Sequence, residues 1–217
     1  MSSTDQPTPM RSDGLPADDD RTDRLMQYEA WLRLLARSEI DSRFQGKFDA
    51  SDAVQQTLME AWKGWQQFRG ADEPQRLAWL RQILAHQLAH LTRHFAGTQM
   101  RDVSREVALE TSLCQSAARL DALLPARGPS PSGLAALEEQ RLQLAQALEQ
   151  LPPDYRQVIL LRNVEELSHQ EVAARMQRGE GAVRMLWVRA LTALRDAMTP
   201  TTDGLSASQR IEPPSET

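Results

Sequence analysis

Apolar residues along most of this chain recur every third or fourth position, the spacing of one face of an α-helix. The clearest run covers residues 24–37, where Leu25, Tyr28, Trp31 and Leu35 fall on one face. Leu, Ala, Gln, Glu and Arg dominate, and strand-forming residues are sparse. That bias favours helices. The pattern therefore predicts an all-α fold.

The same spacing predicts further helices at residues 51–66, 74–95, 134–151, 154–163, 169–176 and 180–198. Ser51 is expected to cap the first of these, and Pro74 suits the first helical turn after the sequence FRGADEP. Trp62 and Trp79 recur at helical spacing with apolar neighbours. We therefore expect both tryptophans to belong mainly to the core.

Segments rich in Ser, Pro, Asp and Gly divide the chain. Residues 1–23 and 199–217 have little apolar content and are predicted to be disordered. Residues 111–133 contain SAARLDALLPARGPSPSG, whose Pro, Gly and Ser content is typical of a linker. We therefore expect two small helical domains, 24–110 and 134–198, joined by this flexible linker.

The net charge of −5 conceals an uneven distribution. The first 24 residues hold six Asp against three Arg. Residues 76–105 hold five Arg against one Asp, and residues 175–198 hold five Arg against one Glu and one Asp. Two basic helical stretches favour binding to nucleic acid. Solvated helix faces are the alternative.

Several functional classes find no support. Cys114 is the only cysteine, so no internal disulfide can form, and a reducing cytoplasm is the natural compartment. No apolar run approaches the roughly 18–20 residues that span a bilayer, and the polar N-terminus lacks the core of a signal peptide. No phosphate-binding loop, dinucleotide fingerprint or catalytic constellation is present. We expect a cytoplasmic protein that is not an enzyme and binds no cofactor.

Three histidines recur at four-residue spacing, at His86, His90 and His94. Such spacing can bind a metal when other ligands converge on it. No Cys or carboxylate is expected nearby on that face, so we predict polar helix residues and no metal site. Ser168 beside His169 resembles a catalytic pair, but helix capping explains Ser168 better.

The clearest local signal is LSHQEVAARM, in which Ser168 and Glu171 match the S-x-x-E capping box at a helix start. A helix of about eight residues, the turn QRGEG and a longer basic helix follow. This order predicts a helix-turn-helix whose second helix lies in the major groove of DNA. Arg184 and Arg189 would point outward and bind phosphates or guanine, with a solvated face as the alternative.

Met185 and Val188 are apolar where that second helix should be polar. They either contact thymine methyl groups or pack against another helix of the same module.

Two long segments resemble a known family. FDASDAVQQTLMEAWKGWQQFRG followed by AWLRQILAHQLAHLTRHF resembles region 2 of the extracytoplasmic-function (ECF) sigma factors, a subfamily of the sigma-70 family. ALEQLPPDYRQVILLRNVEELSHQEVAARMQRGEGAVRMLWVRALTALRDAM resembles their region 4. The two lie in the family's order and cover about residues 24–198. The resemblance implies a sigma factor that binds RNA polymerase core and directs promoter-specific transcription initiation.

The resemblance also implies site residues and partners. Contact with a coiled coil on the largest catalytic subunit of RNA polymerase would involve Asp52, Gln55, Gln56, Leu58, Met59 and Trp62. Contact with the −10 promoter element would involve Arg69, Trp79, Arg81, Gln82, His86, Gln87, His90, Arg93 and His94. Contact with the −35 element would involve Glu180, Gly181, Arg184, Met185, Val188 and Arg189. An anti-sigma protein is a further candidate partner, whereas no membrane and no small-molecule substrate is expected.

The chain departs from the family pattern at the turn of the helix-turn-helix. Gln177 stands where Gly is usual, and Gly179 stands at a cap that is usually Ser or Thr. Two other classes of function stay open at this point. One is a helix-turn-helix regulator that acts without polymerase core, and the other is a helical adaptor whose basic faces bind acidic proteins.

Overall fold

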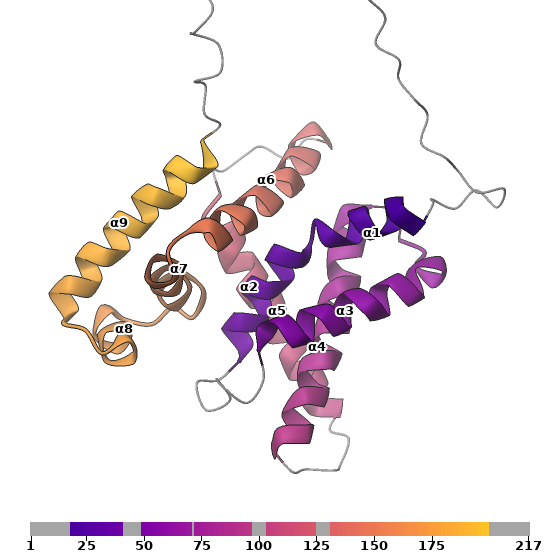
Figure 1. The fold of residues 1–217 in the computed structure, drawn as a ribbon, viewed down its shortest axis with the longest axis horizontal. Coiled ribbons are helices and arrows are strands. Elements are labelled where there is room, and N and C mark those ends of the chain that lie inside the picture. Colours follow the sequence, from indigo (N-terminus) through magenta and orange to yellow (C-terminus); the bar gives the residue numbers. More distant parts are fainter. Residues whose placement is uncertain (1–17, 41–48, 71, 97–102, 125–130, 200–217) are drawn as a thin grey trace, which may run out of the picture.

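The computed structural model describes residues 18–40, 49–70, 72–96, 103–124 and 131–199. Within those residues every regular element is helical, which confirms the predicted all-α class (Figure 1). The elements in chain order are α1 (Asp18–Met26), α2 (Glu29–Glu39), α3 (Ala50–Gly64), η1 (Trp65–Gln67), α4 (Glu73–Ala96), α5 (Val103–Asp121), α6 (Pro131–Gln150), α7 (Pro153–Ile159), η2 (Leu160–Val164), α8 (His169–Met176) and α9 (Glu180–Met198). Over this described part of the chain, no helix is both long and apolar enough to cross a membrane.

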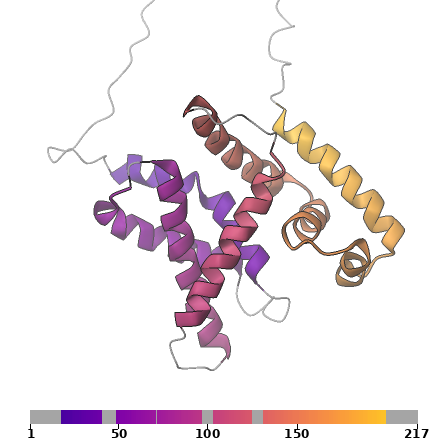
Figure 2. The same cartoon turned by 180° about the vertical axis from the view of Figure 1, so that it is seen from behind.

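Helices α1 to α5 form one group around a shared apolar centre (Figures 1 and 2). α2 contacts α3, α4 and α5, and α4 also contacts α3 and α5. The centre contains fully buried Leu32, Leu35, Leu80, Leu84 and Leu113. Burying one such side chain stabilises a fold by about 1.5–3 kcal/mol. Packing of these apolar faces therefore holds the helices in place more than helix propensity does.

The N-terminal helical segment is longer than predicted and is divided in two. α1 begins at Asp18, inside the segment predicted to be disordered, and the chain turns before α2. Arg21 is only 4% exposed, and its guanidinium lies 5.3 Å from the centre of the Trp62 ring on α3. The prediction of disorder was wrong for residues 18–23 because this contact with α3 fixes them. Residues 1–17 and 200–217 lie outside the described residues.

The cap of α3 also differs from the prediction. The Asp49 carboxylate accepts a hydrogen bond from the Ser51 backbone N–H, and the Asp52 carboxylate accepts one from the Asp49 N–H, both at 3.4 Å. Asp49, and not Ser51, is therefore the N-cap residue. Negative charge at both positions suits the positive end of the helix dipole. Residues 41–48, which precede this cap, lie outside the described residues.

The predicted linker begins too early. α5 continues unbroken to Asp121, and Leu113, Ala117 and Leu120 are buried within it. Those three residues follow the same three- and four-residue spacing as the other core faces. The first half of the predicted linker, residues 111–121, is thus a core helix. The Pro- and Gly-rich residues 125–130 lie outside the described part, and α6 begins at Pro131.

Helices α6 to α9 form a second group. α9 contacts α6, α7 and α8, and Leu148, Val158 and Ile159 are buried between them. α7 begins at Pro153, where the missing backbone N–H removes no helical hydrogen bond. The helical path then widens into the π-helical turn η2.

The described residues hold the two groups in contact, which differs from two domains on a flexible linker. α2 contacts α6, α5 contacts η2, and the buried apolar residues form one continuous cluster. Arg119 on α5 donates a hydrogen bond to the Val164 carbonyl at 2.9 Å. Arg141 on α6 donates two to the Asp121 carboxylate, at 2.8 and 2.7 Å. These polar contacts join the two groups in addition to the apolar contact between them.

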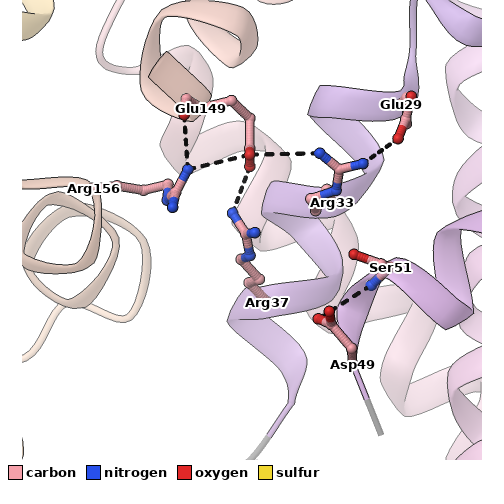
Figure 3. Close-up of polar contacts among 7 residues, drawn as sticks. All are labelled: Glu29, Arg33, Arg37, Asp49, Ser51, Glu149 and Arg156. Carbon is pink, nitrogen blue, oxygen red and sulfur yellow. Dashed lines mark hydrogen bonds and ion pairs between the residues drawn. The ribbon is translucent and has the colours of Figure 1, made fainter. Parts of the chain in front are cut away.

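A cluster of charged side chains, named here the Glu149 cluster, also lies between the two groups of helices (Figure 3). The Glu149 carboxylate lies at the end of α6 and forms ion pairs with Arg33 and Arg37 of α2 and with Arg156 of α7. One acidic side chain therefore joins three helices from both groups.

Candidate nucleic-acid interface

The helix-turn-helix predicted from the sequence is present, and its capping box is confirmed. The Ser168 hydroxyl accepts a hydrogen bond from the Glu171 N–H at 3.2 Å, and the Glu171 carboxylate accepts one from the Ser168 N–H at 2.7 Å. These two bonds satisfy backbone donors that a helix start otherwise leaves unpaired. The hydrogen bonds to Ser168 also lower the pKa of Glu171. The capping box fixes the residue at which α8 begins.

The turn after α8 places a non-glycine residue in the left-handed region. Gln177 has φ +53° and ψ +43°, and the N–H of Arg178 returns to the Ala173 carbonyl at 3.0 Å. This arrangement is the Schellman motif that ends many helices, usually with Gly at the left-handed position. Gly179 then adopts an extended conformation as the N-cap of α9 and offers no side-chain cap.

Replacing Gln177 by glycine is expected to stabilise the protein. A non-glycine residue in the left-handed region costs about 1–2 kcal/mol, and glycine avoids this cost. Part of the stabilisation is lost again, because glycine has greater conformational freedom in the unfolded chain. The net increase in the free energy of unfolding should be about 0.5 kcal/mol, measured by urea denaturation. Gln177→Ala is the control, because it keeps the strain and should not stabilise. A decrease for Gln177→Gly would contradict this account of the turn.

α9 is held with one face inward and one face toward solvent. Val183, Ala190 and Leu194 are buried. The indole N–H of Trp187 donates to the Asn163 side-chain oxygen at 3.0 Å, and the His169 ring packs edge-on against the Trp187 ring at 5.6 Å. These contacts fix the rotation of α9 against η2 and α8. The residues that face outward, as predicted, are Arg184, Met185, Val188 and Arg189.

The arginines near this face differ in how they are engaged. Arg184 pairs with Glu180 one turn earlier on α9, and Arg178 pairs with Asp154 on α7. Arg189 and Arg195 have no ion pair with any described residue. Exposed pairs of this kind contribute only about 0–1 kcal/mol, so an incoming phosphate can displace them. The outer face of α9 is therefore available to an anionic partner.

A hollow lies in the first group of helices, between η1, α4 and the start of α5. It is an open groove of about 960 Å³, with an aromatic wall. The rings of Phe68 and Trp79 stack with centroids 4.7 Å apart, and Trp65 packs on both at 6.4 Å. The Trp79 ring lies close to the backbone of α3, since a Cβ added at Gly64 would lie 3.3 Å from it. Aromatic walls of this kind can stack unpaired bases.

The chain resembles known proteins over most of its length. The family described as "Sigma-70, region 4" matches residues 141–194. The ECF RNA polymerase sigma-E factor of Escherichia coli K12 is 29% identical over 160 residues, which cover 73% of this chain and 78% of that protein. The ECF RNA polymerase sigma factor SigG of Mycobacterium tuberculosis is 31% identical over 207 residues, covering 91% of this chain and 54% of that protein.

This chain is similar to ECF sigma factors over most of its length. A solved structure of the sigma factor RpoE in complex with the anti-sigma factor NepR, from Bartonella quintana, also aligns with 83% of this chain and 97% of that one. Its sequence identity is 22% and its TM-score is 0.31.

The groove gathers only part of the residue set expected at the −10 element. Its lining includes six of the nine, namely Arg69, Trp79, Gln82, His86, Gln87 and His90. Arg81 lies elsewhere, with its guanidinium 6.0 Å from the Trp31 ring. Arg93 is half-buried and pairs with Glu106 at 3.1 Å. The side chain of His94 lies outside the described residues.

Three of the five arginines that the sequence shows at residues 76–105 are engaged by other described residues. Arg76 hydrogen-bonds to the Tyr28 hydroxyl at 3.2 Å and pairs with Glu73. Together with the contacts of Arg81 and Arg93, this leaves little free positive charge on the described part of α4. Glu60, Glu106 and Glu110 also line the groove. Recognition there would depend on stacking and hydrogen bonds more than on net positive charge.

The expectation that no carboxylate lies near the histidines was wrong. Glu106 on α5 lies 3.5 Å from Nδ1 of His86, because α5 packs against α4. Sequence spacing on one helix could not reveal a ligand supplied by another. Among the described residues, no group of three or more His, Cys, Asp or Glu side chains is placed to hold a metal ion.

A third surface runs along α3 and is defined here as the α3 face: Asp52, Gln55, Gln56, Met59 and Trp62. All five side chains are exposed, and Met59 is 51% exposed. Leu58, expected in the same set, is partly buried against the core. Trp62 was predicted to belong to the core, but it is 41% exposed, and its ring contacts the Arg21 guanidinium of α1.

Proposed function

We propose that this chain is an ECF sigma factor, which binds RNA polymerase core and directs it to specific promoters. The single observation that carries the proposal is the capped helix-turn-helix, whose outer α9 face is exposed and lies within the region 4 match. Its chemistry is limited to binding, and bond formation belongs to the polymerase. A factor of this kind acts in the cytoplasm, where the bacterial chromosome lies.

Each of the three surfaces described above has a proposed role in transcription initiation. The outer face of α9 reads the −35 element, and the aromatic groove accepts unpaired bases of the −10 element. The α3 face docks on the coiled coil of the largest catalytic subunit. Helices α1–α5 and α6–α9 act as the region 2-like and region 4-like units. An anti-sigma protein is a further proposed partner.

The test of this function is transcription in vitro with purified polymerase core and a genomic template library. We expect transcripts that start downstream of one shared promoter sequence and that require the sigma factor. If the chain binds duplex DNA but never binds core, a free helix-turn-helix regulator becomes the better account. If it binds neither, both DNA-based functions fail.

Replacing arginines on the α9 face is expected to weaken promoter binding. Arg184→Ala and Arg189→Ala should each lower affinity by roughly tenfold, because a good arginine–base contact contributes about 1–3 kcal/mol. An arginine that contacts phosphate should instead lower affinity for all sequences and reduce the salt slope by about one. Fluorescence anisotropy with the full chain at several salt concentrations separates the two roles.

The matched control for these variants is Arg195→Ala, which removes the same charge near the far end of α9. It should have a much smaller effect, because the first turns of a recognition helix approach the bases. Equal losses for all three variants would indicate attraction by net charge, without a defined docking geometry.

A further inference from the structure

Two large apolar side chains stand on the outer face of α9. Met185 is 54% exposed and Val188 is 51% exposed, and they lie about one helical turn apart. The neighbouring helices α6, α7 and α8 contact α9, but the buried residues of α9 are Val183, Ala190 and Leu194. Packing within the described chain therefore does not explain this apolar pair.

The surroundings of the pair favour DNA over an apolar protein surface. Arg184 and Arg189 are exposed directly beside Met185 and Val188, and Arg189 has no ion pair with any described residue. An apolar protein partner would strip water from these guanidinium groups without compensation, which is costly. The major groove instead offers phosphates along its edges and one apolar group on its floor, the C5 methyl of thymine.

The spacing of the pair matches the spacing of bases. Residues three apart on a helix are separated by about 4.5 Å along its axis, and stacked base pairs by about 3.4 Å. With α9 in the major groove, two such side chains on one face are close enough together to reach neighbouring base pairs. Gly181, one turn earlier, leaves open space, since an added Cβ would meet nothing within 4 Å. That space lets the start of α9 come close to the groove.

We propose that Met185 and Val188 select thymine at two neighbouring base pairs of the −35 element by burying its C5 methyl group. The proposal rests on the proposed function, because it requires α9 to enter the major groove. It assigns part of the promoter preference to apolar contact. It also explains why side chains that are costly to expose stand on a surface helix.

The test compares thymine with deoxyuridine, which lacks only the methyl group and keeps every hydrogen-bonding atom. A duplex library with a randomised upstream element is enriched with the holoenzyme formed from the full chain and polymerase core. Each thymine of the enriched duplex is then replaced singly by deoxyuridine. We expect two neighbouring positions at which the replacement lowers affinity by about fourfold, the effect of one buried methyl group.

Two variants test which side chain contacts the C5 methyl group of each thymine. Val188→Thr keeps the shape and replaces one methyl by a hydroxyl, and Met185→Gln keeps the approximate length. Each variant should bind the thymine duplex more weakly and should lose the thymine–deoxyuridine difference at one position only. Arg189→Ala is the control, because it should weaken both duplexes equally and keep the difference.

The outcomes separate this inference from the function on which it rests. If the holoenzyme binds its promoter and no deoxyuridine replacement matters, the methyl readout is wrong and the proposed function stands. If the variants keep the difference but lose polymerase core, the apolar pair contacts protein and the inference is also wrong. If no promoter is enriched at all, the proposed function itself fails.

Discussion

Replacing Glu149 by alanine is expected to lower the free energy of unfolding by about 2–3 kcal/mol, the range for removing one partner of a charged hydrogen-bonded group that is partly buried. The Glu149 carboxylate is 17% exposed and lies 2.5 Å from Arg37, 3.2 Å from Arg156 and 3.6 Å from Arg33. Its backbone carbonyl also accepts a hydrogen bond from Arg156 at 2.9 Å. Without the carboxylate, three guanidinium groups would face one another.

The physical setting makes this loss larger than that of an ordinary surface pair. Burial lowers the pKa of Arg37, and the Glu149 carboxylate opposes that shift. The cluster also joins α2, α6 and α7, so its loss should loosen the contact between the two groups of helices (Figure 3). Urea denaturation measures the stability, and small-angle X-ray scattering should show a larger radius of gyration for the variant.

A matched control is available on the same helix. Glu139 is exposed, and its carboxylate accepts one hydrogen bond, from Gln143 at 3.1 Å. Glu139→Ala should change stability by less than about 0.5 kcal/mol, as is usual for surface substitutions. If Glu149→Ala behaves like Glu139→Ala, the cluster does not hold the two groups together.

Introducing a negative charge into the α3 face is expected to lower affinity for polymerase core at least tenfold while leaving the fold intact. Met59→Glu and Gln55→Glu are the variants, because both side chains are exposed. A desolvated charge without a partner at an interface can cost several kcal/mol. Core binding is measured by native gel shift or surface plasmon resonance, and circular dichroism checks the helices.

Asp52→Arg is a less clean variant than the sequence suggests. The Asp52 carboxylate belongs to the capping box of α3, so its reversal would also remove a helix cap, at about 1 kcal/mol. The matched control for Gln55→Glu is Gln146→Glu on α6, which makes the same change at another exposed glutamine. Core binding that matches the parent in both Met59→Glu and Gln55→Glu would remove the α3 face as the docking surface.

The sequence by itself determined the features that depend on neighbours within one helix. The apolar spacing located the helical segments except α5 and most of α1, and the capping box of Ser168 and Glu171 located the helix-turn-helix to the residue. The same periodicity placed Arg184, Met185, Val188 and Arg189 outward on α9. These signals are readable because residues three and four apart share one face whatever the rest of the chain does.

Only the tertiary structure decided what those faces meet. The basic stretch of α4 looked like a surface for nucleic acid, but Arg76, Arg81 and Arg93 are engaged by groups from α2, α4 and α5. Residues 111–121 looked like part of a linker, but their leucines pack into the core. Glu149 carried no signal at all, because its arginines come from two other helices. Charge and burial depend on partners far away in the sequence, and packing alone brings those partners together.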